Sequence, residues 1–94
     1  MKDKLLKIIN NYGLLNQTRQ FNEECYELIE AIFDYEYTEI SNEKWREHIA
    51  EEIADCYVML EQFRNYYGIK AKDITEIMER KIDRQLERMK GGNE

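Results

Sequence analysis

Apolar residues recur at three- and four-residue intervals along almost the whole chain, and no stretch alternates apolar and polar residues at every second position. This spacing is typical of amphipathic α-helices. It predicts four helices, over residues 2–12, 16–35, 43–67 and 70–89. Gly13 and Gly68 each follow an aromatic-rich stretch and are predicted to end a helix. Residues 37–42 break the period and predict a loop.

Polar residues at the predicted helix starts indicate where each helix begins. Asn16 is the predicted N-cap of the second helix, and Ser41 or Asn42 that of the third. Asp73 and Glu76 match a capping pattern, so a start a few residues later stays open for the fourth helix. We expect one all-α domain over residues 1–94, an antiparallel four-helix bundle with a frayed tail over about 90–94.

Two short acidic motifs stand 28 residues apart, Glu24-x-x-Glu27 in the second helix and Glu52-x-x-Asp55 in the third. Each places two carboxylates one turn apart beside an apolar stripe. The stripes comprise Phe21, Cys25, Leu28 and Ile32, then Ile49, Ile53, Cys56, Leu60 and Phe63. Four carboxylates at the seam of two packed helices would repel one another unless a hard cation neutralised them. The motifs therefore predict a Mg²⁺ site, which Mn²⁺ would also suit, and phosphate chemistry.

The acidic pairs can also be ordinary solvent-facing carboxylates without a ligand. Such pairs are common on solvated helix faces, and 20 of the 94 residues are Asp or Glu.

The fourth helix carries a basic flank of Lys81, Arg84 and Arg88 beside its apolar stripe. This flank suits a metal-bound polyphosphate, or else pairs with neighbouring glutamates on the same helix. Gln20 lies on the same flank of the second helix as Glu24.

Composition narrows the function classes. The chain has 43% hydrophobic and 36% charged residues, no proline and a net charge of −6. This acidity argues against a nucleic acid polymer as partner. The N-terminus is too polar for a signal peptide, and no apolar run approaches the ~20 residues that span a membrane. We expect a cytoplasmic protein without a membrane partner, and oligomerisation because so short a chain buries only a small core.

The motifs resemble those of the MazG-like nucleoside triphosphate pyrophosphohydrolases, in the all-α NTP pyrophosphatase superfamily. The family pattern is E-E-x-x-E followed by E-x-x-D, and residues 23–27 and 52–55 match it. A Lys-x-x-Arg segment of the family matches residues 81–84. The resemblance covers roughly residues 17–88.

The resemblance implies that Mg²⁺ is bound, and catalysis performed, by Glu24, Glu27, Glu52 and Asp55. It implies that Lys81 and Arg84 contact phosphate oxygens, with Arg88 and Gln20 as further candidates for substrate binding. The implied reaction cleaves the α–β phosphate bond of an NTP or dNTP to give a monophosphate and pyrophosphate. A carboxylate of the second helix is the expected base. A homodimer or homotetramer is implied to complete the site.

Two alternatives stay open. One is a non-catalytic helical module that binds nucleotides or drives oligomerisation, and the other, within the enzyme class, is a phosphoribosyl-ATP pyrophosphatase. A di-iron carboxylate bundle needs paired Glu-x-x-His motifs, and the sequence holds a single histidine, so this class is excluded.

Overall fold

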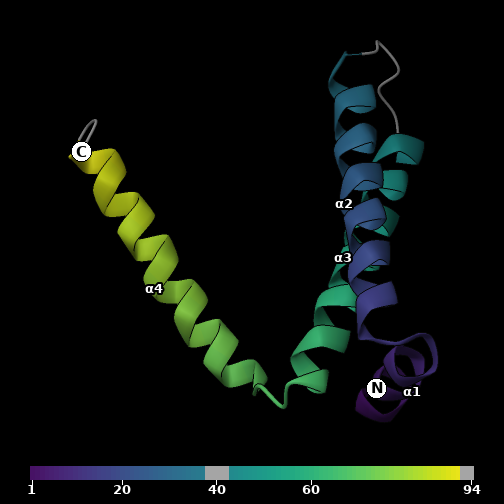
Figure 1. Cartoon of the computed structure of the whole chain (residues 1–94). Helices are drawn as coiled ribbons and strands as arrows, with labels where there is room; N and C mark the ends of the chain where they lie inside the picture. Colours follow the sequence, from purple (N-terminus) through teal and green to yellow (C-terminus); the bar gives the residue numbers. More distant parts are fainter. Residues whose placement is uncertain (38–42, 92–94) are drawn as a thin grey trace.

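The structure is a computed structural model that describes residues 1–37 and 43–91, and these residues form four helices and no strand. The helices are α1 (Lys2–Tyr12), α2 (Leu14–Tyr37), α3 (Glu43–Tyr66) and α4 (Ala71–Lys90) (Figure 1). The all-α class and the number of helices are as the apolar periodicity predicts. The predicted loop and the caps at Ser41 and Asn42 fall in residues 38–42, and most of the predicted tail in 92–94, both outside the described residues.

One predicted helix start is wrong, and one alternative start is excluded. α2 begins at Leu14, so Asn16 lies within its first turn, where its side-chain amide donates to the Tyr12 carbonyl at 2.8 Å. A single residue separates α1 from α2, because Gly13 adopts a φ of +91° that turns the chain within one peptide unit. α4 begins at Ala71, which excludes the later start suggested by Asp73.

The core lies where α1, α2 and α3 pack against one another. Phe21 of α2 meets Phe63 of α3 edge to face, with ring centroids 5.6 Å apart. The buried apolar side chains of the described residues are Leu5, Ile9, Ala31, Cys56 and Met59.

The seam between α2 and α3 is turned away from the centre of the predicted apolar stripes. Gln17 and Ala31 are buried on α2, and Glu24 lies half-buried midway between them, seven residues from each. By contrast, Ile32, Ile53 and Leu60 were expected in the core and are 43%, 36% and 48% exposed. The prediction that these three side chains are buried is therefore wrong for a single chain. The acidic flanks of α2 and α3 face each other, and this leaves one side of each apolar stripe uncovered.

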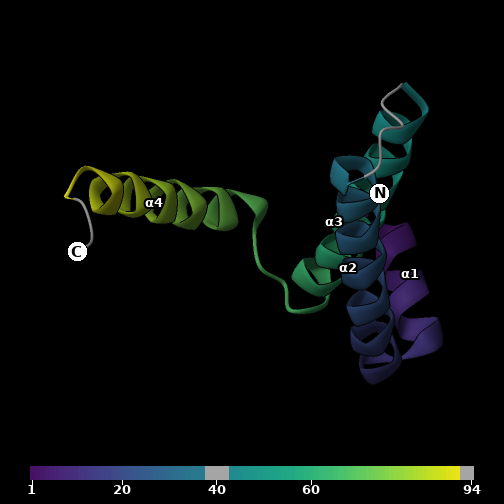
Figure 2. The same cartoon turned by 90° about the horizontal axis from the view of Figure 1, so that it is seen from above.

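α4 extends away from the three packed helices in both views (Figures 1 and 2). None of its residues is buried, although its sequence is amphipathic. No helix in the described part of the chain is both long enough and apolar enough to cross a membrane.

Candidate metal centre

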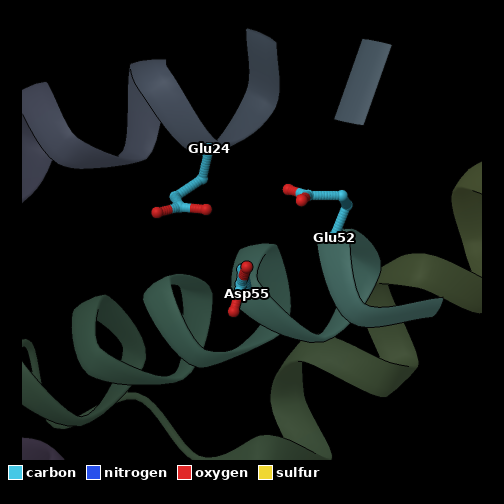
Figure 3. Close-up of side chains that lie close together, drawn as sticks. All are labelled: Glu24, Glu52 and Asp55. Atoms are coloured by element: carbon cyan, nitrogen blue, oxygen red, sulfur yellow. The ribbon is translucent and has the colours of Figure 1, made fainter. Parts of the chain in front are cut away.

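Three carboxylates from the two acidic motifs meet at the α2–α3 seam. Glu24 of α2 and Glu52 and Asp55 of α3 each offer one oxygen, and these oxygens lie within 4.8 Å of one another (Figure 3). Glu52 and Asp55 share a helix face because they are one turn apart, and the packing of α2 on α3 brings Glu24 opposite them. We call these three residues the acidic cluster.

The acidic cluster contains two buried oxygens without a protein partner. The Oε2 atoms of Glu24 and Glu52 are buried and accept no hydrogen bond from any described residue. An unsatisfied buried acceptor costs about 1–3 kcal/mol, and more when the group is charged. Converging negative charges add repulsion to this cost. A hard divalent cation would relieve both penalties, since carboxylate oxygens are its preferred ligands, and the residues therefore fit a metal ion.

Glu27, the fourth predicted ligand, lies one turn further along α2, is exposed, and does not belong to the group of three. Its charge nevertheless interacts with the cluster. The pKa of its carboxyl is raised above the ordinary value of 4.5, mainly by Glu24, then by partial desolvation, and further by Glu52, Asp55 and Glu23. Glu27 is thus adjacent to the cluster on its solvent side.

Gln20, predicted to bind substrate, lies next to the cluster. Its side-chain Nε2 donates a hydrogen bond of 2.8 Å to Glu24 Oε1. The two oxygens of Glu24 consequently differ, because Oε1 is held by an amide while Oε2 is the one left without a partner. This arrangement orients the carboxylate toward α3.

The predicted phosphate-binding residues are not brought to the cluster within one chain. Lys81, Arg84 and Arg88 are exposed and lie on α4, the helix that extends away from α2 and α3 (Figure 2). The charged groups that raise the pKa of Glu27 are all acidic, and no salt bridge of the described residues joins a basic side chain to Glu24, Glu52 or Asp55.

Two features of the site region did not emerge from the sequence. A buried amide pair joins Gln17 of α2 to Gln62 of α3 at 2.8 Å. Gln62 stands seven residues after Asp55, as Gln17 stands seven before Glu24, so this spacing could have placed both amides on the cluster's seam. The second feature is an ion pair between Glu61 and Arg64 at the end of α3, at 2.8 Å.

The fold and the site define the class of this protein: it is an all-α protein in which carboxylates converge between two helices. The chain belongs to the MazG nucleotide pyrophosphohydrolase domain family, whose model matches residues 14–89. The match covers α2, α3 and nearly all of α4, and thus every predicted site residue. No curated protein and no solved structure matches the chain at a significant level.

Proposed function

We propose that this protein is a Mg²⁺-dependent pyrophosphohydrolase that cleaves the α–β phosphate bond of a nucleoside or deoxynucleoside triphosphate in the cytoplasm. The observation that carries this proposal is the pair of buried, unpartnered oxygens of Glu24 and Glu52 in a chain of this family. Such oxygens are suited to a divalent cation, and a divalent cation is the usual companion of a triphosphate.

The proposed ligands are Glu24, Glu52 and Asp55, with Glu27 joining them from the next turn of α2. Bound Mg²⁺ would offset the combined negative charge of these carboxylates and of the triphosphate, and would stabilise charge on the phosphate oxygens as the reaction proceeds. Mn²⁺ prefers the same oxygen ligands and is expected to substitute.

In the proposed reaction, water attacks the α phosphorus, and the bond from this phosphorus to the bridging oxygen breaks. Pyrophosphate leaves with the electron pair of that bond, and the nucleoside monophosphate retains the oxygen of the water. A base must accept the proton of the attacking water. Glu27 suits this role best, because it is exposed one turn from Glu24 and lies outside the three oxygens that converge in the cluster.

The remaining site residues are assigned to the substrate. Lys81 and Arg84, with Arg88 beside them, would bind phosphate oxygens through charge-assisted hydrogen bonds. Gln20 lies at the edge of the cluster and is proposed to contact the substrate while holding Glu24. A homodimer or homotetramer is proposed as the functional form.

The test is release of pyrophosphate from a panel of nucleoside triphosphates, with Mg²⁺ and with chelator. We expect Mg²⁺-dependent release by the wild type and a loss of about 100-fold or more in Glu52→Gln, because a ligand position supports several kcal/mol of charge stabilisation. Glu51→Gln is the matched control, since Glu51 is the exposed neighbour on the same helix. Equal rates in Glu52→Gln and the wild type would contradict the ligand role. Nucleotide binding without turnover would favour a non-catalytic module.

A further inference from the structure

The two cysteines of the chain lie beside the acidic cluster, one on each helix of its seam. Cys25 follows Glu24 on α2, and Cys56 follows Asp55 on α3. Oxygens of Glu24 and Asp55 lie within 4.8 Å of each other. The packing of α2 on α3 therefore brings the two cysteines to the same level of the helix pair as the cluster.

The faces of α2 and α3 that carry the cysteines are in contact. Phe21 stands one turn before Cys25 on α2, and Phe63 stands two turns after Cys56 on α3. These two aromatic rings meet edge to face, with centroids 5.6 Å apart. The ring contact and the acidic cluster thus hold the two helices together on either side of the cysteine pair.

The two thiols themselves contact each other. Burial is the main cause that raises the pKa of the Cys56 thiol, and Cys25 adds to it through its charge and through a side-chain hydrogen bond. Such a bond requires the sulfur atoms to be neighbours. A disulfide needs the Cβ atoms of its two residues about 3.5–4.5 Å apart, so this pair is close to the geometry that an oxidant can convert.

The two cysteines differ in access to solvent. Cys56 is buried, whereas Cys25 is half-buried. Buried cysteines commonly serve as small apolar side chains, which accounts for Cys56 alone. Cys25 is the one that a small oxidant in solution can reach, and it has a second thiol behind it. Redox-sensing cysteines have this arrangement, in which an accessible thiol lies next to a resolving one.

We propose that peroxide converts Cys25 and Cys56 into a reversible disulfide that ties α2 to α3 and lowers the affinity of the acidic cluster for Mg²⁺. The disulfide is independent of the proposed function, whereas its effect on Mg²⁺ rests on it. In a reducing compartment such a bond is transient, which suits a regulatory role.

The reaction takes two steps. The Cys25 sulfur attacks one peroxide oxygen, the O–O bond breaks, and the other oxygen leaves as water with the thiol proton, so that Cys25 becomes a sulfenic acid. The Cys56 sulfur then attacks the Cys25 sulfur, the S–S bond forms and the S–O bond breaks. A second water leaves with the Cys56 proton. Two thiols are thus oxidised by two electrons, which reduce one peroxide to two waters. A dithiol reductant reverses the change by exchange.

The expected effect on the metal follows from the position of the bond. Each cysteine is the immediate neighbour of a cluster carboxylate, Glu24 or Asp55. A disulfide fixes how far apart and in what rotation the two backbones stand at this level. Mg²⁺ demands a nearly ideal octahedron of oxygens, so a cluster that cannot adjust should bind it about 10-fold more weakly.

Peptide mapping after hydrogen peroxide treatment tests the disulfide without any need for activity or metal. In chelator, we expect a linked pair of peptides that contains Cys25 and Cys56 within one chain, and its loss after dithiothreitol. The oxidised protein should also show an unfolding equilibrium constant about 100-fold lower in urea. Cys25→Ala is the control and should yield neither change. Oxygen added to either cysteine without a linked pair, or chains joined to one another through these cysteines, would overturn the disulfide.

Calorimetric titration with Mg²⁺ tests the effect on the cluster. The oxidised wild type should bind about 10-fold more weakly than the reduced protein and recover on reduction, whereas peroxide-treated Cys25→Ala should keep its affinity. Equal affinities of the oxidised and reduced wild type would overturn the regulatory role. A reduced protein that binds no Mg²⁺ would contradict the proposed function and with it the effect on Mg²⁺, while the linked peptides would still establish the disulfide.

Discussion

Gln17 and Gln62 are hydrogen-bonded to each other inside the helical core, with Nε2 of the first 2.8 Å from Oε1 of the second. The side-chain Nε2 of Gln62 in turn donates to the Met59 sulfur, 3.7 Å away. This pair bridges α2 and α3 on the seam that also carries Glu24 and Asp55. It therefore fixes how the two helices that supply the acidic cluster are rotated toward each other.

Replacing one glutamine of this pair is expected to destabilise the fold more than replacing both. Gln62→Met leaves the Gln17 amide buried without its partner, at a cost of about 1–3 kcal/mol in the free energy of unfolding. The double variant Gln17→Met/Gln62→Met removes the need for a partner and should recover most of that loss. Urea denaturation of the four proteins of this cycle measures the coupling. Strict additivity of the two single changes would show that the bond contributes nothing specific.

Glu52→Gln is expected to change stability in opposite directions with and without metal. In chelator the variant should be more stable than the wild type, because it removes one of three converging negative charges. At a Mg²⁺ concentration of 100 times the Kd, the wild type should gain about 2.7 kcal/mol, while the variant gains little. Thermal unfolding in the two buffers gives the comparison, with Glu51→Gln as the control that should follow the wild type. A parallel response of Glu52→Gln and wild type to Mg²⁺ would count against the site.

The raised pKa of Glu27 predicts a pH-dependent stability difference in the absence of metal. The folded state holds the Glu27 proton more tightly than the unfolded state does, so ionising this group costs stability above its raised pKa. The penalty disappears below the ordinary value of 4.5, where the group is protonated in both states. In chelator, Glu27→Gln should therefore be more stable than the wild type at pH 7, and this advantage should shrink toward pH 4.

The control for this comparison is Glu30→Gln, another exposed glutamate of α2 that does not contribute to the raised pKa of Glu27. It should show no comparable change in its stability relative to the wild type over the same pH range. An advantage of Glu27→Gln that is equally large at pH 7 and pH 4 would mean that the electrostatic interaction with the cluster is not its source.

Gln20→Ala tests whether the amide next to the cluster orients Glu24. The bond from Gln20 Nε2 to Glu24 Oε1 is exposed, so its loss should weaken Mg²⁺ binding by about 10-fold, at the low end of effects seen for residues that support ligands. Asn22→Ala, an exposed change on the same helix, is the control. Calorimetric titration with Mg²⁺ gives both affinities. An unchanged affinity in Gln20→Ala would leave Gln20 with a substrate role alone.

The apolar periodicity was sufficient to predict the helices of this chain, because each helix has a repeating apolar stripe. Gly13 and Gly68 mark where α1 and α3 end. It was not sufficient to predict which side of each stripe faces the other helix. Ile53 and Leu60 belong to the predicted stripe but are exposed, whereas Met59 lies beside this stripe and is buried. The buried amide pair and the acidic flanks decide the rotation instead. Projecting each helix at 100° per residue does not show which buried amides will pair between two helices.

The acidic cluster was predictable because Glu52 and Asp55 have fixed helical spacing and the matching motif on α2 supplies Glu24. The position of α4 was not predictable. Glu61 and Arg64 have the spacing of a helical ion pair, but no spacing indicates the bond from Arg64 to the Ile69 carbonyl at the turn into α4.

We propose that a divalent cation occupies the seam between Glu24, Glu52 and Asp55. Diffraction from crystals grown with Mn²⁺, recorded for its anomalous signal, measures this directly. We predict a peak within metal–oxygen bonding distance of all three carboxylates, and no such peak in crystals of Glu52→Gln. Anomalous peaks found only at other carboxylates, with the Oε2 atoms of Glu24 and Glu52 still unpartnered, would contradict the account.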